Sequence, residues 1–188
     1  MNGLIHDTTL YDDIPLGEGR EEKEMAVYRL LKELQIPYKR MDHEEMATIE
    51  ACRGIDELLG IHMCKNLFLC NSQNTVFYLL LMPGEKKFKT KELSKQIGSA
   101  RLSFGPEEYM EELLNIRPGS VSIMGLMNDR ENRVKLLIDE DVLKEEFLGC
   151  HPCVNTASLK VKTQDIIEKF LPYVKHDFIV VNLTGKEE

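Results

Sequence analysis

Two short segments that lie far apart in the sequence carry side chains capable of chemistry. In residues 65–69, Lys-Asn-Leu-Phe-Leu, a cation opens a run that otherwise has the composition of a buried strand. In residues 149–157, His151 lies in a turn bounded by glycine and proline that leads into another strand-like run. A lysine at a strand start and a histidine in a tight loop are uncommon in a core, so we expect the two segments to share a pocket.

Both residues also have a structural interpretation. Lys65 could pack its stem on apolar neighbours while its ammonium reaches water, or it could be a fixed cation with three donors that orients an oxygen-rich substrate. His151 could be a structural histidine, or it could position substrate and move protons while loop N–H groups stabilise an anion. The residues alone leave both interpretations open.

Cys150 and Cys153 have the spacing of a redox pair or of half a zinc site. Zinc would need two more ligands, and the chain has no second paired motif, with His62, Cys64 and Cys70 as scattered candidates. A redox pair usually opens a helix, whereas this pair precedes a strand. We therefore expect both thiols to pack, and we expect neither a metal nor a cofactor.

The composition indicates a globular protein of one domain. Of its 188 residues, 43% are hydrophobic and 30% are charged. The apolar run at residues 76–82 has the length of a strand rather than of a membrane span, and residues 1–20 lack the pattern of a secretory signal. Five cysteines, an odd number, favour reduced thiols. We expect a cytoplasmic protein with no membrane contact.

The charge distribution argues against a broad nucleic-acid footprint, because the net charge is −8 and phosphate contacts need clustered cations. The net negative charge does not exclude a small contact with one RNA end. A local basic stretch, opposed only by Glu85 and Glu92, contains Lys86, Lys87, Lys89, Lys91, Lys95 and Arg101. A solvated helix face explains such a stretch equally well.

Hydrophobic spacing and turn residues predict an α+β fold in a single domain. We expect a mixed central β-sheet of about six or seven strands with peripheral helices, over residues 21–188, preceded by an N-terminal tail at residues 1–20. Helices are predicted at residues 21–35, 48–59, 91–97, 106–114, 139–147 and 163–170. Strands are predicted at residues 38–41, 66–70, 76–82, 121–123, 134–138, 154–161 and 178–182.

Two further runs, Ala-Arg-Leu-Ser-Phe at 100–104 and Pro-Gly-Ser-Val at 118–121, lie in order between residues 65–69 and residues 149–157, which we call the two chemical segments. Together these four runs resemble the YbaK/ProX family of aminoacyl-tRNA deacylases. These enzymes are relatives of the editing domain inserted in bacterial prolyl-tRNA synthetases. The resemblance spans about residues 25–183. The run at 65–69 is most similar to the branch that clears alanine from proline tRNA, and the cysteine-clearing branch usually lacks it.

The resemblance implies roles for particular residues. Lys65 would orient the aminoacyl ester and the terminal adenosine, and His151 would lie near the amino-acid moiety, so these two are the expected catalytic residues. The expected substrate-binding residues are Thr48, Ala51, Asn66, Gly125, Gly149, Cys150 and Asn155. The substrate would be the 3′ acceptor end of aminoacylated proline tRNA, with prolyl-tRNA synthetase as a further candidate partner.

The implied reaction is hydrolysis, in trans, of alanine wrongly attached to proline tRNA, assisted by the 2′-hydroxyl of the terminal ribose and needing no metal. Three alternatives remain open from the sequence. The chain could be a cysteine-specific deacylase of the same tRNA, or a non-catalytic module that binds prolyl-tRNA, proline or the synthetase. It could also be a thiol redox or zinc protein built on Cys150 and Cys153.

Overall fold

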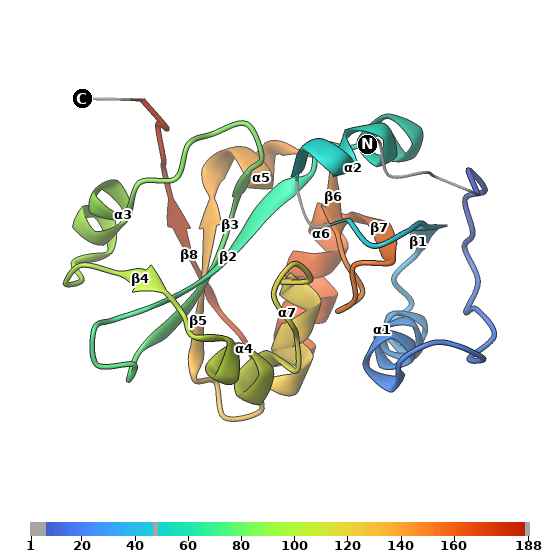
Figure 1. The fold of residues 1–188 in the computed structure, drawn as a ribbon, viewed down its shortest axis with the longest axis horizontal. Coiled ribbons are helices and arrows are strands. Elements are labelled where there is room, and N and C mark those ends of the chain that lie inside the picture. The colour runs from blue at the N-terminus through green and yellow to red at the C-terminus, as the bar shows by residue number, and fades with distance from the viewer. Residues whose placement is uncertain (1–6, 47–48, 187–188) are drawn as a thin grey trace.

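The computed structural model describes residues 7–46 and 49–186, with the backbone alone described over residues 49–53. Over this part of the chain, eight strands form two sheets that are flanked by helices (Figure 1). The predicted mixed α+β fold in a single domain is confirmed. The strands nevertheless divide between two sheets, where the sequence predicted one central sheet.

The larger sheet is mixed and has the strand order β4-β2-β3-β5-β8. Its first three strands are antiparallel, and β3, β5 and β8 run parallel. The strands span β2 (Cys64–Cys70), β3 (Phe77–Pro83), β4 (Ser103–Phe104), β5 (Val134–Asp139) and β8 (Phe178–Val181). The smaller sheet is antiparallel, with the order β1-β7-β6, and contains β1 (Tyr38–Asp42), β6 (Phe147–Cys150) and β7 (Ala157–Lys162).

A single parallel bridge between Met63 and Gly149 connects the two sheets. The glycine permits this approach, because a Cβ at position 149 would lie 2.4 Å from Ile61 Cδ1 and 2.8 Å from Met63 Sδ. The pairing does not extend beyond this bridge into a ladder between β2 and β6. The sheet therefore splits at the point where the two chemical segments begin.

The helices form where apolar residues recur at helical spacing, as Val27, Leu30 and Leu31 do on the buried face of α1. Residues with left-handed backbone end two of them, Gly98 after α3 and Asn115 after α4. The helices span α1 (Glu22–Glu33), α2 (Ile49–Leu59), α3 (Thr90–Ile97), α4 (Glu107–Leu114), α5 (Glu140–Lys144), α6 (Thr163–Asp165) and α7 (Leu171–Tyr173). A π-helical stretch, Ile166–Phe170, joins α6 to α7. No helix in the described ranges is long and apolar enough to cross a membrane.

Three predicted elements differ from the structure. Residues 121–123 do not form a strand: Ser122 accepts a hydrogen bond from the N–H of Met124 and starts a 3-10 helix, Ile123–Asn128. The helix predicted at 139–147 ends at Lys144, because Phe147 and Leu148 pair with β7 as strand β6. The strand predicted from residue 154 begins only at Ala157, after a turn in which Cys153 has φ 63°.

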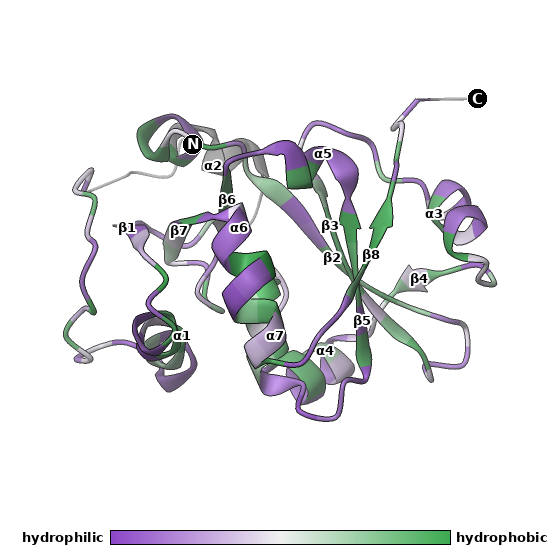
Figure 2. Cartoon of the chain, turned by 180° about the vertical axis from the view of Figure 1, so that it is seen from behind, coloured by the Kyte–Doolittle hydropathy of each residue, from purple (hydrophilic) through white to green (hydrophobic). Residues whose placement is uncertain are grey.

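The core divides according to the faces of the sheets. Along β2, Phe68 and Cys70 join the main cluster, while Leu69 joins a second cluster with Leu93 of α3. A third cluster beneath α2 contains Met41, Met46, Ile55, Leu59, Ile61 and Met63. The residues before α1 also pack, since Tyr11 forms a bridge with Arg40 of β1. Figure 2 shows hydrophobic residues both in strands of the larger sheet and in bands along the helices between α6 and α7, where they alternate with hydrophilic residues.

Candidate active site

The bridge between the sheets brings the two chemical segments together. Lys65 lies two residues beyond Met63, and His151 lies two residues beyond Gly149. Because the bridge is parallel, both segments leave it in the same direction. The two segments therefore start side by side at this bridge, and the pocket that they would share stays a prediction.

Lys65 lies between the helices α2 and α3. Side chains two apart on a strand share a face, and Met63 belongs to the cluster beneath α2 while Leu67 packs against the cluster of α3. The half-buried Lys65 places its Nζ 2.5 Å from the carbonyl oxygen of Lys86 and donates to it. That contact fixes the ammonium but occupies one of its three N–H groups, so the others can reach a ligand.

Asn66 points to the opposite face of β2. It pairs with Leu81, which belongs to the main cluster, whereas Lys65 pairs with Met82 in the cluster of α3. Its amide Nδ2 donates to the carbonyl oxygen of Cys64 at 3.2 Å. Its Oδ1 is buried and has no partner among the described residues. The structure thus separates the side chains of these two expected site residues.

The His151 imidazole is buried and has a defined tautomer. Its Nδ1 lies 2.9 Å from the carbonyl oxygen of Ala157, which can only accept, so Nδ1 carries the proton and Nε2 has the lone pair. The Ser122 hydroxyl donates to the carbonyl oxygen of His151 at 2.6 Å and holds the backbone of the loop. His151 therefore offers an acceptor nitrogen at a fixed position.

A second histidine, His43, lies beside the first and was not identified from the sequence. The two rings are 6.2 Å apart. His43 Nδ1 donates to the carbonyl oxygen of Glu44 at 2.7 Å, and Nε2 therefore accepts from the Ser158 hydroxyl at 2.9 Å. Ser158 is fully buried, at 0% exposure, so this serine–histidine pair stabilises the site rather than attacking a substrate. The available sequence signal was a histidine two residues after a predicted strand.

Burial lowers the pKa of both His43 and His151 below the ordinary histidine value of 6.5. The carbonyl oxygen of Ala157 opposes this shift at His151, and the neighbouring His43 reinforces it. Both imidazoles are therefore neutral at pH 7, which suits a site that uses His151 Nε2 as an acceptor.

This shift predicts that the protein loses stability in mild acid. Below pH 6.5 the unfolded histidines bind protons that the folded ones do not, so the free energy of unfolding falls as the pH falls. Each histidine contributes a slope of up to about 1.4 kcal/mol per pH unit. Urea unfolding at several pH values between about 5 and 7.5 would measure it, with a His43→Gln, His151→Gln double variant as the comparison. Equal slopes in the two proteins would contradict the assignment.

The loop after His151 is tied to the segment that leads into α2. Asn155 Nδ2 donates to Glu45 Oε1 at 3.1 Å, and the Asn155 carbonyl oxygen accepts from the N–H of Met46 at 3.4 Å. A third bond runs from the N–H of His43 to the carbonyl oxygen of Thr156 at 2.9 Å. These contacts support a positioning role for Asn155.

The two cysteines of the loop are buried. Burial raises the pKa of Cys150 and raises that of Cys153 to about 12, so both thiols stay protonated. Among the described residues, no group of three or more candidate ligands could hold a metal ion. This environment favours packing over the redox and zinc alternatives.

The remaining expected site residues are placed as follows. Gly125 lies in the 3-10 helix, where a Cβ would meet Ile116 Cδ1 at 2.5 Å and Leu114 Cβ at 3.1 Å, so close packing against the end of α4 explains the glycine. Thr48 lies outside the described residues. Ala51 lies within α2, and its side chain is outside the described part of the chain.

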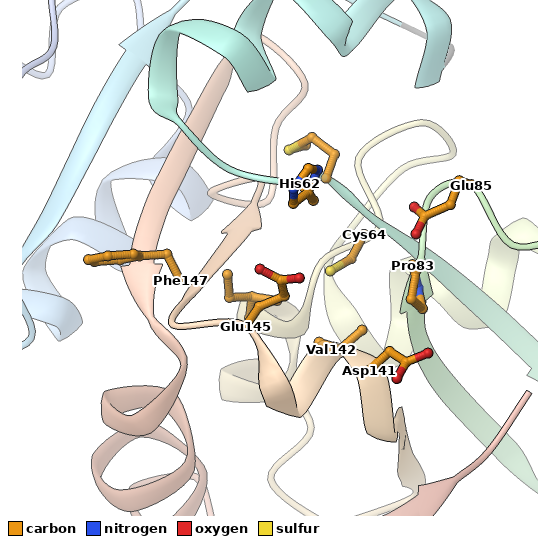
Figure 3. Close-up of a pocket in the computed structure, with 10 residues that line it drawn as sticks. His62, Cys64, Pro83, Glu85, Asp141, Val142, Glu145 and Phe147 are labelled. Atoms are coloured by element: carbon orange, nitrogen blue, oxygen red, sulfur yellow. The ribbon is translucent and has the colours of Figure 1, made fainter.

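A separate acidic cavity lies on the other side of β2, at Cys64 (Figure 3). It encloses about 140 Å³, and its lining includes Glu85, Asp141 and Glu145 but neither Lys65 nor His151. Burial, reinforced by Glu85 and Glu145, raises the pKa of the Cys64 thiol to about 12. The negative charge of this lining disfavours a phosphate-bearing ligand, so we place the active site on the face of Lys65.

Comparison with known proteins shows the family of the chain. The family model described as aminoacyl-tRNA editing domain matches residues 43–169, a span that begins at His43 and includes Lys65 and His151. The prolyl-tRNA editing protein ProX of Acetoanaerobium sticklandii is 30% identical over 162 residues, which cover 86% of this chain and 98% of that protein. The prolyl-tRNA synthetase associated domain-containing protein 1 of Bos taurus is 30% identical, covering 86% of this chain and 95% of that protein.

Among solved structures, the crystal structure of a proposed trans-editing enzyme for prolyl tRNA synthetase superposes with a TM-score of 0.64. The superposition covers 89% of this chain and 99% of the solved chain, with 16% sequence identity. At this identity the similarity supports the fold alone. The family match extends over more than half of the 188 residues. The chain therefore belongs to the family of aminoacyl-tRNA editing domains.

Proposed function

We propose that this aminoacyl-tRNA deacylase acts in trans to remove alanine that has been wrongly attached to proline tRNA. The observation that best supports the proposal is the parallel bridge at Met63 and Gly149, from which the segments of Lys65 and His151 leave in the same direction. The printed names of the ProX and synthetase-associated relatives supply the connection to proline tRNA. The reaction belongs in the cytoplasm, where the tRNA is charged, and prolyl-tRNA synthetase is a candidate partner.

Such an enzyme is needed because binding alone discriminates poorly between small apolar side chains. A synthetase site built for proline loses only about 1–3 kcal/mol of binding free energy when a slightly smaller side chain occupies it. A second site that admits alanine and excludes proline corrects the error by hydrolysis. The resemblance of residues 65–69 to the alanine-clearing branch favours alanine over cysteine as the removed group.

In this mechanism the ester at the 3′ end lies beside Lys65, whose remaining N–H groups donate to its oxygens or to the terminal adenosine. His151 Nε2 accepts a hydrogen bond from the amino group or from the attacking water. Gly149 allows the loop to approach the start of β2, and Asn155 holds the loop to the segment before α2. Loop N–H groups stabilise the tetrahedral oxyanion, a contribution of about 3–4 kcal/mol for one well-placed donor.

Water is the proposed nucleophile, assisted by the 2′-hydroxyl of the terminal ribose. It adds to the ester carbonyl, the bond to the 3′ oxygen breaks, and that oxygen takes a proton as alanine leaves. The neighbouring hydroxyls support this choice, because Ser122 donates to a backbone carbonyl and Ser158 is buried against His43. Neither side chain is available as a covalent nucleophile.

A panel of alanyl, cysteinyl and seryl esters of proline tRNA tests the proposal against its alternatives. We expect the alanyl ester to be hydrolysed fastest under single-turnover conditions. Faster cysteine release would assign the chain to the cysteine-specific alternative. Tight binding of the tRNA without release of any amino acid would leave only the non-catalytic binding module.

A further inference from the structure

A basic stretch interrupts an otherwise acidic chain. Residues 85–104 contain six cationic and two acidic side chains, while the whole protein has a net charge of −8. The stretch includes the loop after β3, the helix α3 and the short strand β4. It therefore contrasts in charge with the rest of the molecule.

This stretch lies next to the active-site lysine. Lys65 Nζ donates to the backbone carbonyl of Lys86, within the loop after β3. Leu69 pairs with Phe104 across β2 and β4, and it lies four residues along β2 from Lys65. Because residues at even spacing share a face, Lys65 and Phe104 lie on the same side of the sheet, about 13 Å apart along the strand direction. Figure 1 shows β2 running from the end near α2 toward β4 and α3.

The stretch combines an exposed aromatic ring with exposed cations. Phe104 is 66% exposed and meets Phe88 edge-on, with the ring centroids 6.0 Å apart. Lys95 at the end of α3 and Arg101 between α3 and β4 are exposed, and Figure 2 shows α3 as predominantly hydrophilic. Lys86 differs, because its ammonium is bound by Asp139 and Asp141. Exposed rings beside cations are the features of surfaces that bind single-stranded nucleic acid.

We propose that Lys95, Arg101 and Phe104, which we call the basic strip, bind the single-stranded 3′ end of the RNA whose terminal ester lies at Lys65. The cations contact phosphates, and the Phe104 ring stacks on a base that precedes the terminal adenosine. The proposal rests on the proposed function, since it takes the terminal ester to lie at Lys65. RNA fits the strip better than a protein partner does, because phosphates supply a row of anions and bases supply flat rings for Phe104.

Binding of an uncharged acceptor-stem hairpin with a single-stranded 3′ end tests the strip without requiring ester hydrolysis. Fluorescence anisotropy at several salt concentrations would give the dissociation constant and its salt dependence. We expect a Lys95→Ala, Arg101→Ala double variant to bind about tenfold more weakly and to lower the slope of log affinity against log salt by about 1.4. Phe104→Ala is expected to weaken binding about tenfold and to leave that slope unchanged.

The matched controls are a double variant of exposed lysines elsewhere, Lys32→Ala with Lys162→Ala, and Tyr173→Ala for the exposed ring. Weakening in the strip variants alone supports the proposal. It is overturned if strip and control variants bind equally, or if the strip variants lose binding to prolyl-tRNA synthetase while they keep RNA binding. Ester hydrolysis by the wild type is measured separately, so a protein that binds RNA through the strip but releases no amino acid would refute the proposed function only.

Discussion

Replacing Lys65 with alanine is expected to slow ester hydrolysis by about two to three orders of magnitude, because the ester oxygens lose a charged donor, a loss comparable to that of removing one oxyanion donor. The substitution should leave the fold intact, because Lys65 Nζ contacts only one backbone carbonyl among the interactions that the structure assigns to it. Single-turnover release of alanine from alanyl proline tRNA measures the effect.

The matched control for this lysine is Lys162→Ala, which removes an exposed lysine from the end of β7. Its rate should equal that of the wild type. Lys65→Arg is a useful second variant, because it keeps the charge but changes the shape and hydration of the donor. A folded Lys65→Ala protein with a rate within about threefold of the wild type would remove Lys65 from the catalytic residues.

The largest loss of stability is expected from Asp139→Ala. This fully buried carboxylate accepts from Lys86 Nζ at 2.9 Å, from the N–H of Asp141 at 2.9 Å and from the N–H of Leu183 at 3.2 Å. Its removal leaves the N–H groups of Asp141 and Leu183 without this acceptor, leaves Lys86 paired with Asp141 alone, and removes the cap of α5. We expect the free energy of unfolding to fall by about 3–5 kcal/mol, as measured by urea denaturation.

Asp139→Asn keeps the shape and one acceptor oxygen, so a smaller loss is expected for it. Glu112→Ala provides the exposed control, because its ion pair with Arg133 lies at the solvent-exposed surface, where such pairs contribute little to stability. A loss for Asp139→Ala no larger than that for Glu112→Ala would contradict the role of this carboxylate. The Lys86 carbonyl oxygen accepts a hydrogen bond from Lys65, and the Lys86 ammonium pairs with Asp139. The rate of ester hydrolysis by the Asp139 variants therefore also tests whether the ion pair between Asp139 and Lys86 helps to position Lys65.

Local sequence signals predicted most of the elements but not how the sheets divide. β2, β3 and β5 follow from apolar runs bounded by turns, and the apolar spacing of α1 is helical. β6 was not predicted as a strand: the predicted helix ran to Phe147, the first residue of β6, and this short strand pairs only with β7, beyond the turn. The split into two sheets depends on one bridge between Met63 and Gly149, a contact that no local pattern encodes.

The site was predictable where polar residues interrupt apolar runs, as Lys65 and His151 do. His43 was missed because its partner Ser158 is 115 residues away in the sequence. The separation of Asn66 from Lys65 follows from strand alternation, since neighbours on a strand face opposite sides. Sequence reasoning thus proposed candidate residue types, whose roles stay predictions, and did not reveal the contacts that orient them.

The most direct test of the account compares the alanyl and prolyl esters of the same proline tRNA in single-turnover hydrolysis. The wild-type protein is expected to release alanine rapidly and to leave the prolyl ester at its spontaneous rate of hydrolysis. This result would establish that the site admits the wrong amino acid and excludes the correct one. Release of proline at a rate comparable to alanine, or release of neither, would contradict the assignment as an editing enzyme for proline tRNA.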